Sequence, residues 1–276
     1  MTLTPLMLLD ERLGLPQFDL PEELRRLYGG GLGFDGPSVF ANFVETIDGV
    51  VAIPDVARSN AIVSDESDAD RFVMGLLRAV ADVVVVGSGT MLAAPQGTWR
   101  AERVYPAAAD AYAELRRRLG KSEHPAVAIV TAGGSFDPTH PVLETGAVVL
   151  TTERAAPDIR ATVPSASEVV AVNTGDWVDP MGALAVLRAR GYELVLSEGG
   201  PMLFTSLVAA GLVDELFLTV APLLAGRSGV PRLSLADGAE LLPDVRVAGD
   251  LESIRRHGSH LFLRYRLGSS NWTTTR

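Results

Sequence analysis

Two glycine-rich turns are the segments of this sequence best suited to hold a charged ligand. Gly87-Ser88-Gly89-Thr90 directly follows the apolar run VVVV at 83–86, and Gly199-Gly200 lies between another apolar run and Pro201. Glycine lets backbone N–H groups approach a phosphate closely, and a helix that starts at such a turn adds partial positive charge. The two turns therefore indicate a ligand with a pyrophosphate or several anionic groups.

The same turns could also be tight connections without a ligand, and neither matches a standard nucleotide motif. Leu92 takes the sixth position of the hexapeptide that begins at Gly87, where the dinucleotide fingerprint needs glycine or alanine. The P-loop pattern G-x-x-x-x-G-K-[ST] is absent. If a dinucleotide binds, we expect a different binding scheme.

Other kinds of chemistry find little support. The sequence has no cysteine, and its four histidines, His124, His140, His257 and His260, do not form a zinc-ligand pattern. We therefore expect no metal site and structural or surface roles for the histidines. The run Arg116-Arg117-Arg118 is expected on a solvated helix surface.

Composition limits the partners. Hydrophobic residues make up 47% of the 276 residues, enough for a sizeable core, and the formal net charge of −10 disfavours nucleic-acid and anionic-membrane surfaces. No apolar run is long enough to span a membrane, and the first residues do not resemble a signal peptide. We expect a cytoplasmic protein.

Strand and helix patterns alternate through most of the chain, which predicts an α/β fold. Its mostly parallel central sheet would be flanked by helices and would end in a C-terminal antiparallel hairpin. Strands are expected at 38–46, 83–86, 126–131, 147–152, 168–173, 192–198 and 215–222, and the hairpin at 246–256 and 260–267. Helices are expected at about 65–81 with Ser64 as N-cap, at 107–119, from Asp179-Pro180 to Gly191, and at 201–210.

No linker interrupts residues 38–267, so we predict one domain there. Residues 1–37 are expected to be an irregular lead-in, either a poorly ordered arm or a packed strap. Residues 268–276 would form a short tail.

The later half of the chain closely resembles the reductase domain of bacterial riboflavin biosynthesis, and the resemblance extends over about residues 38–267. The motifs that carry it are Glu198-Gly199-Gly200-Pro201, GLVDEL at 211–216, APLLAG at 221–226, Thr46-Ile47-Asp48-Gly49, Leu76-Leu77-Arg78 and Val86-Gly87-Ser88-Gly89-Thr90.

This resemblance implies a dihydrofolate-reductase-like fold, NADPH as cofactor and a homodimer. It implies reduction of 5-amino-6-(5-phosphoribosylamino)uracil or a related ribosylamino-pyrimidine, with hydride transfer from the nicotinamide to the sugar C1.

The resemblance also assigns candidate residues. The substrate would be held by Asn42, Ser59, Arg78, Arg100 and Glu198, and the catalytic candidates are Asp48 and Glu198. Of the two roles for Asp48, turn-former is favoured over proton donor, since Asp-Gly is a tight-turn pair. The cofactor would be held by Val44, Thr90, Thr131, Ala132, Gly199, Gly200, Pro201, Met202, Leu203 and Phe204, with Thr131 and Ala132 at the 2′-phosphate.

Two departures from the family pattern concern the substrate side. Asn42 stands where many members have lysine, and Ala94-Pro95-Gln96 stand where they carry aspartates. The zinc deaminase signature of the bifunctional enzymes is absent, which excludes that activity. Two alternatives stay open: a dihydrofolate or pterin reductase on the same fold, and a non-catalytic nucleotide-binding protein.

Overall fold

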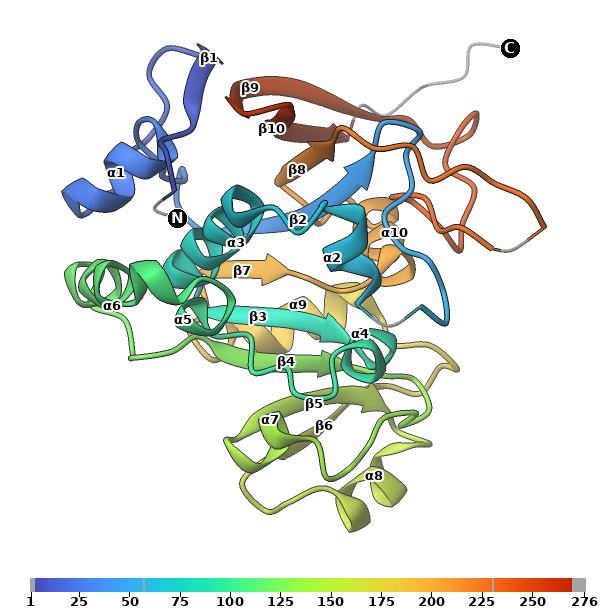
Figure 1. Ribbon diagram of the computed structural model, residues 1–276. Coiled ribbons are helices and arrows are strands. Elements are labelled where there is room, and N and C mark those ends of the chain that lie inside the picture. The colour runs from blue at the N-terminus through green and yellow to red at the C-terminus, as the bar shows by residue number, and fades with distance from the viewer. Residues whose placement is uncertain (1–2, 57, 230, 270–276) are drawn as a thin grey trace.

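The computed structural model describes residues 3–56, 58–229 and 231–269. Its strands form one sheet (Figure 1), with the order β1-β9-β10-β8-β2-β7-β3-β4-β5-β6. The strands are β1 (Met7–Glu11), β2 (Ser38–Thr46), β3 (Val83–Gly87), β4 (Ala126–Val130), β5 (Ala147–Thr152), β6 (Glu168–Asn173), β7 (Leu194–Ser197), β8 (Glu215–Ala221), β9 (Val247–His257) and β10 (His260–Ser269).

The sheet is parallel from β8 through β2, β7, β3, β4 and β5 to β6, and antiparallel from β8 through β10 and β9 to β1. This arrangement confirms the predicted fold class, including the C-terminal hairpin. The β-branched run of β3 is buried on both faces, as expected for a central strand covered by helices.

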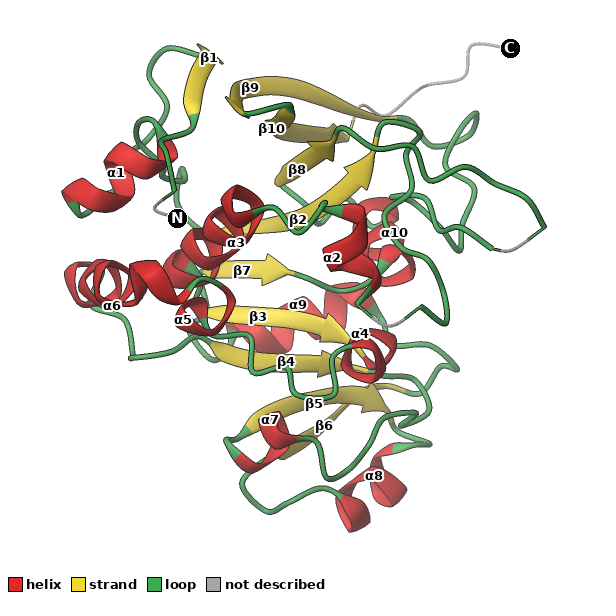
Figure 2. Cartoon of the chain, viewed as in Figure 1, coloured by secondary structure: helices red, strands yellow, loops and turns green. Residues whose placement is uncertain are grey.

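Helices cover both faces of the sheet (Figure 2). They are α1 (Glu22–Tyr28), α2 (Ser59–Val63), α3 (Asp68–Val80), α4 (Ser88–Ala93), α5 (Ala101–Val104), α6 (Ala109–Arg118), α7 (Pro141–Glu144), α8 (Ala156–Thr162), α9 (Pro180–Arg188) and α10 (Pro201–Ala209), with a 3-10 turn at Pro106–Ala108. The largest apolar core joins one face of the sheet to α1, α3 and α6, and two smaller cores join the other face to α9 and α10. Among the described residues, no helix is long and apolar enough to cross a membrane.

Helix α3 begins three residues later than the sequence pattern indicates. Asp65 and Glu66 have φ values of 54° and 50°, in the left-handed region that a right-handed helix cannot use. Ser67 is the N-cap instead of Ser64, and its hydroxyl accepts a hydrogen bond from the Asp70 N–H at 3.2 Å. The predicted N-cap was therefore wrong, although the apolar face of the helix is buried as expected.

The lead-in is a packed strap with its own strand and helix, not an irregular segment. β1 pairs with β9, and leucines of the lead-in enter the largest core. The fully buried Arg255 of β9 donates to the Tyr28 carbonyl at 2.9 Å and to the Glu11 carboxylate at 2.6 Å. Its guanidinium also lies 4.0 Å from the centre of the Tyr28 ring. The hairpin thus fixes the strap in place. Residues 270–276 of the predicted C-terminal tail lie outside the described residues.

Candidate functional site

The two glycine-rich turns lie beside each other at the carboxyl ends of β3 and β7. These strands are hydrogen-bonded neighbours, with Val85 opposite Ser197. α4 starts directly after Gly87, and α10 starts after Gly200, in each case without a side-chain cap from the N-cap residue. The first-turn N–H groups of α10 are therefore not taken up by their own N-cap side chain. In a parallel sheet this edge is where ligands bind.

The glycines of the two turns differ in what surrounds them. A Cβ on Gly199 would collide with the Leu203 side chain, so this glycine is needed for close packing. A Cβ on Gly200 would face open space, with the Thr90 hydroxyl nearest at 3.9 Å, and one on Gly89 would have no neighbour within 4 Å. We call the open space beside Gly200 and Thr90 the cradle; a side chain added at Gly200 would enter it.

Arg78 and Glu198, both predicted substrate residues, form a bidentate ion pair. Arg78 Nε donates to Glu198 Oε1 at 2.9 Å and Nη2 donates to Oε2 at 2.6 Å, and the side chains are 11% and 8% exposed. Arg78 Nη1 also lies 3.4 Å from the Arg100 carbonyl oxygen. The structure therefore brings Arg78, Arg100 and Glu198 together from α3, the turn before α5, and the end of β7.

Arg100 is the member of this group that keeps its charge available. Its side chain is half-buried, and within the described residues the guanidinium makes no hydrogen bond or ion pair. A half-buried cation without a protein partner is suited to an anionic ligand group, because a guanidinium binds phosphate bidentately. Arg78, in contrast, is already neutralised by Glu198.

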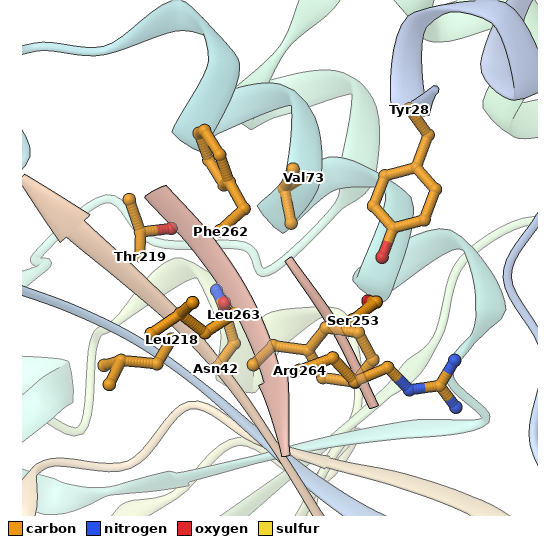
Figure 3. A pocket seen from close by; sticks show the side chains of 10 residues that line it. Tyr28, Asn42, Val73, Leu218, Thr219, Ser253, Phe262, Leu263 and Arg264 are labelled. Carbon is orange, nitrogen blue, oxygen red and sulfur yellow. The ribbon is translucent and has the colours of Figure 1, made fainter. Parts of the chain in front are cut away.

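Ala41 of β2 pairs with Ser197, the last residue of β7. Asn42 and Glu198 are the residues that follow this pair. The Asn42 side chain lines a small cavity below α3 (Figure 3). The cavity is also lined by Tyr28, Val73, Phe217, Leu218, Thr219, Ser253, Phe262, Leu263 and Arg264. The Asn42 side chain makes no hydrogen bond to a described residue, so its neutral amide is available to a ligand.

Two further predicted residues lie near α2. Val44 is buried against Val63 and Ala221, and the Ser59 hydroxyl accepts a hydrogen bond from the Ile53 N–H at 2.6 Å. Ser59 is thus partly committed to holding the loop that leads into α2. Neither of these contacts involves the Arg78–Glu198 pair.

Asp48 braces a loop. Its carboxylate accepts hydrogen bonds from the Thr46 hydroxyl at 2.6 Å and from the N–H groups of Ala225 and Gly226 at 3.0 and 2.8 Å. These bonds, the one from Thr46 first, lower the pKa of Asp48 to about 2. A carboxylate held ionised in this way is a poor proton donor, so the geometry favours the turn-forming role.

The proposed 2′-phosphate contacts are only partly accessible. Thr131 is buried, and its hydroxyl accepts a hydrogen bond from the Gly134 N–H at 2.9 Å, while the Ala132 carbonyl accepts one from Thr152 at 3.2 Å. Of the α10 residues assigned to the cofactor, Pro201 and Phe204 are buried, Leu203 is half-buried and Met202 is exposed. Phe204 packs on Phe43 with ring centres 4.9 Å apart, so it supports the cradle from behind.

Three residues near the site had no motif to reveal them. Arg154 is the second residue after β5 and is 70% exposed, with Asp176 3.4 Å away. Asp70 is buried in α3, accepts from Thr219, and has its pKa raised to about 6, mainly by burial. His140 contacts the loop that carries Arg100. A cation after a predicted strand could have indicated Arg154. The positions of Asp70 and His140 depend on tertiary contacts.

A glycine-lined open space at the carboxyl edge of a mostly parallel sheet, with a buried ion pair beside it, is an arrangement suited to ligand binding on an α/β fold. A family model described as the RibD C-terminal domain matches residues 37–258. The chain belongs to this family.

Relatives and solved structures agree with this assignment. A 2,5-diamino-6-ribosylamino-4(3H)-pyrimidinone 5′-phosphate reductase of Archaeoglobus fulgidus is 28% identical over 80% of this chain and 94% of its own length. The protein of the same name from Methanothermobacter thermautotrophicus is 30% identical over 75% and 88%. A pyrimidine reductase-like protein of Corynebacterium diphtheriae shares the fold, with a TM-score of 0.67, 21% identity, and coverage of 85% of this chain and 93% of that one.

Proposed function

We propose that this protein is an NADPH-dependent reductase of a ribosylamino-pyrimidine 5′-phosphate. The observation that carries the proposal is Arg100, whose carbonyl oxygen lies 3.4 Å from Arg78 Nη1 of the Arg78–Glu198 pair and whose half-buried guanidinium has no partner among the described residues, next to a glycine cradle. The two ligand regions match the two ligands of such a reaction, and the two curated relatives described above are named for it.

The cofactor residues fit the proposal. The N–H groups at the start of α10 and the turn at Gly87–Thr90 would hold the pyrophosphate, and Gly200 leaves the room it needs. When bound, NADPH supplies the hydride. The chain itself supplies binding and orientation: Leu203 and Phe204 pack behind the cradle and fix its position.

Each proposed substrate residue has a role that follows from its charge. Arg100 would bind the phosphate, and Glu198 would accept hydrogen bonds from donors of the pyrimidine or the sugar. Arg78 holds the Glu198 carboxylate in one orientation through two hydrogen bonds. Positioning of this kind lowers the barrier by fixing the reacting carbon relative to the cofactor.

Preference for NADPH over NADH is the finer part of the proposal. Arg154 supports it, because it is the only Lys or Arg in the described turns that directly follow β4, β5 and β6. The cradle at β3 and β7 lies two strands from β5, about 10 Å, a distance that the adenosine half of a dinucleotide can span. We also propose a cytoplasmic homodimer, as the family resemblance implies.

An assay of NADPH oxidation tests the proposal with three substrates. These are the diamino-pyrimidinone phosphate, the corresponding uracil phosphate, and dihydrofolate. The proposal requires a pyrimidine phosphate to be the best substrate by kcat/KM. Dihydrofolate as best substrate would instead support the pterin reductase, which the neutral Asn42 favours. Binding of NADPH without turnover of any of them would support the non-catalytic alternative.

A further inference from the structure

The loop between α4 and α5 carries Arg100, and its own side chains do little to hold it. Within the described residues, no side chain from Ala94 to Thr98 makes a hydrogen bond. The Gly97 N–H donates to the Ala94 carbonyl at 2.8 Å, which closes a tight turn. Contacts from elsewhere must therefore fix where Arg100 lies.

His140, at the end of the connection from β4 to α7, makes two of these contacts. It is 2% exposed, and its Nε2 lies 2.9 Å from the Ala94 carbonyl oxygen. Its ring stacks on Trp99, with centres 5.8 Å apart and an angle of 28° between the planes. Trp99 directly precedes Arg100 in the chain, so both contacts act on the segment that places Arg100.

The imidazole is itself fixed by a third contact. Nδ1 accepts the Val142 N–H at 3.3 Å as the N-cap of α7. Because Nδ1 is an acceptor, the ring proton is on Nε2, and Nε2 donates to Ala94. One neutral tautomer satisfies both hydrogen bonds, which gives the ring a single orientation.

The backbone of the loop indicates that its shape depends on these contacts. Trp99 has a φ of 50°, a left-handed conformation that is unfavourable for a bulky residue, yet its side chain is buried at 4% exposure. A Cβ on Gly97 would lie 3.0 Å from both the Ala94 carbonyl oxygen and the Trp99 ring, so the turn closes directly on the indole. Such a conformation persists where surrounding contacts over-determine it.

We propose that His140 is a positioning residue for substrate binding, which acts through Ala94 and Trp99 to place Arg100 beside the Arg78–Glu198 pair. This inference rests on the proposed function, in which Arg100 binds the substrate phosphate. His140 does not touch the substrate. It connects the segment after β4 to the loop that carries Arg100.

The test compares His140→Phe, which keeps a ring against Trp99 but loses both hydrogen bonds, with Tyr112→Phe. Tyr112 is a matched control, because its buried hydroxyl donates a hydrogen bond of 2.9 Å to the Phe72 carbonyl, which is not part of the loop. We expect His140→Phe to raise KM for the pyrimidine phosphate about tenfold. The NADPH dissociation constant should stay within twofold, and Tyr112→Phe should leave both constants unchanged. His140→Gln, which can still donate to Ala94, should recover part of the loss.

Hydrogen exchange gives a readout that needs no turnover. His140→Phe should speed exchange of the amides at 97–101 by tenfold or more, while those of β3 and β7 stay as in the parent protein. Unchanged exchange in the loop, or a KM effect no larger than that of Tyr112→Phe, would overturn the inference. A parent protein without turnover would instead contradict the proposed function, and the exchange result would still decide the role of His140.

Discussion

Arg78 and Glu198 are 120 residues apart in the sequence, and their side chains meet in a bidentate ion pair at 2.9 and 2.6 Å. The pair joins α3 to Glu198, the residue between β7 and the glycine turn Gly199-Gly200. Its low exposure makes each partner dependent on the other, because an unpaired charge is costly in a partly buried position.

Replacing Glu198 by Gln tests whether the pair serves the substrate. The amide keeps the shape but loses the charge, so we expect kcat/KM for the pyrimidine phosphate to fall by about 10- to 100-fold, or ~1–3 kcal/mol. NADPH affinity should stay within a few-fold. Glu215→Gln is the control, because Glu215, the first residue of β8, forms a similarly buried pair with Arg264 of β10. If Glu198→Gln and its control both lower only Tm, the pair is structural.

The two neighbouring glycines give a paired test of the cofactor cradle. Saturating NADPH at 100 times its dissociation constant should stabilise the protein by about 2.7 kcal/mol, which a melting scan detects. Gly200→Val should remove this shift with little change in the Tm of the free protein, since its side chain enters open space. Gly199→Ala should lower the free-protein Tm because its Cβ meets Leu203. An NADPH shift that survives in Gly200→Val would contradict the cradle assignment.

Asp70 predicts how stability depends on pH. Burial raises the pKa of this carboxyl from 3.8 to about 6 in the folded protein, so ionisation costs more there than in the unfolded chain. Its contribution to stability is therefore fully present below about pH 4 and is lost as the pH rises through 6. Two pKa units correspond to roughly 3 kcal/mol.

Asp70→Asn, which cannot ionise, should consequently gain stability relative to the parent as the pH rises from 4 to 8. The gain would approach ~3 kcal/mol if the Thr219 contact is kept. Urea unfolding at pH 4.5 and pH 8 measures it. A difference between the two proteins that is the same at both pH values would show that Asp70 is ionised throughout this range.

Arg154 predicts cofactor choice. Arg154→Gln should raise KM for NADPH about tenfold or more and leave KM for NADH within twofold, because only NADPH carries the 2′-phosphate. Arg160→Gln is a suitable control on the neighbouring α8, where the side chain donates to the Val169 carbonyl. Equal effects on both cofactors would mean that Arg154 acts elsewhere than at the 2′-phosphate.

Periodicity and turn residues predicted the strands from residue 38 onward, their order and the two glycine turns, because these depend on local patterns, but they missed β1 and α1. Arg116 shows where such reasoning fails. Its neighbours Arg117 and Arg118 are solvent-accessible, but Arg116 is 3% exposed and donates to the carbonyls of Ala79 and Ala81 at 3.1 and 2.8 Å. Burial lowers its pKa to about 10. The prediction of a solvated run was wrong for this residue, because the end of α3 needs donors that only the packed structure reveals.

The candidate site shows the same division. The family resemblance identified Arg78, Arg100 and Glu198, which the fold brings together. No sequence pattern showed that Glu198 neutralises Arg78 while the Arg100 guanidinium finds no partner among the described residues, or that the Thr131 hydroxyl is used within its own turn. These outcomes depend on which acceptor lies nearest after folding, and the linear sequence does not contain that distance.

The strap has a practical consequence for how the protein can be divided. The part that the family model matches, residues 37–258, omits β1 and all of β10. A chain cut at those limits would leave both long sides of β9 without a hydrogen-bonding neighbour and would leave Arg255 without Glu11 and Tyr28. Unpaired strand edges of this kind promote association between molecules. We expect such a fragment to aggregate. The segment that the family model matches is therefore shorter than the unit that covers both edges of β9.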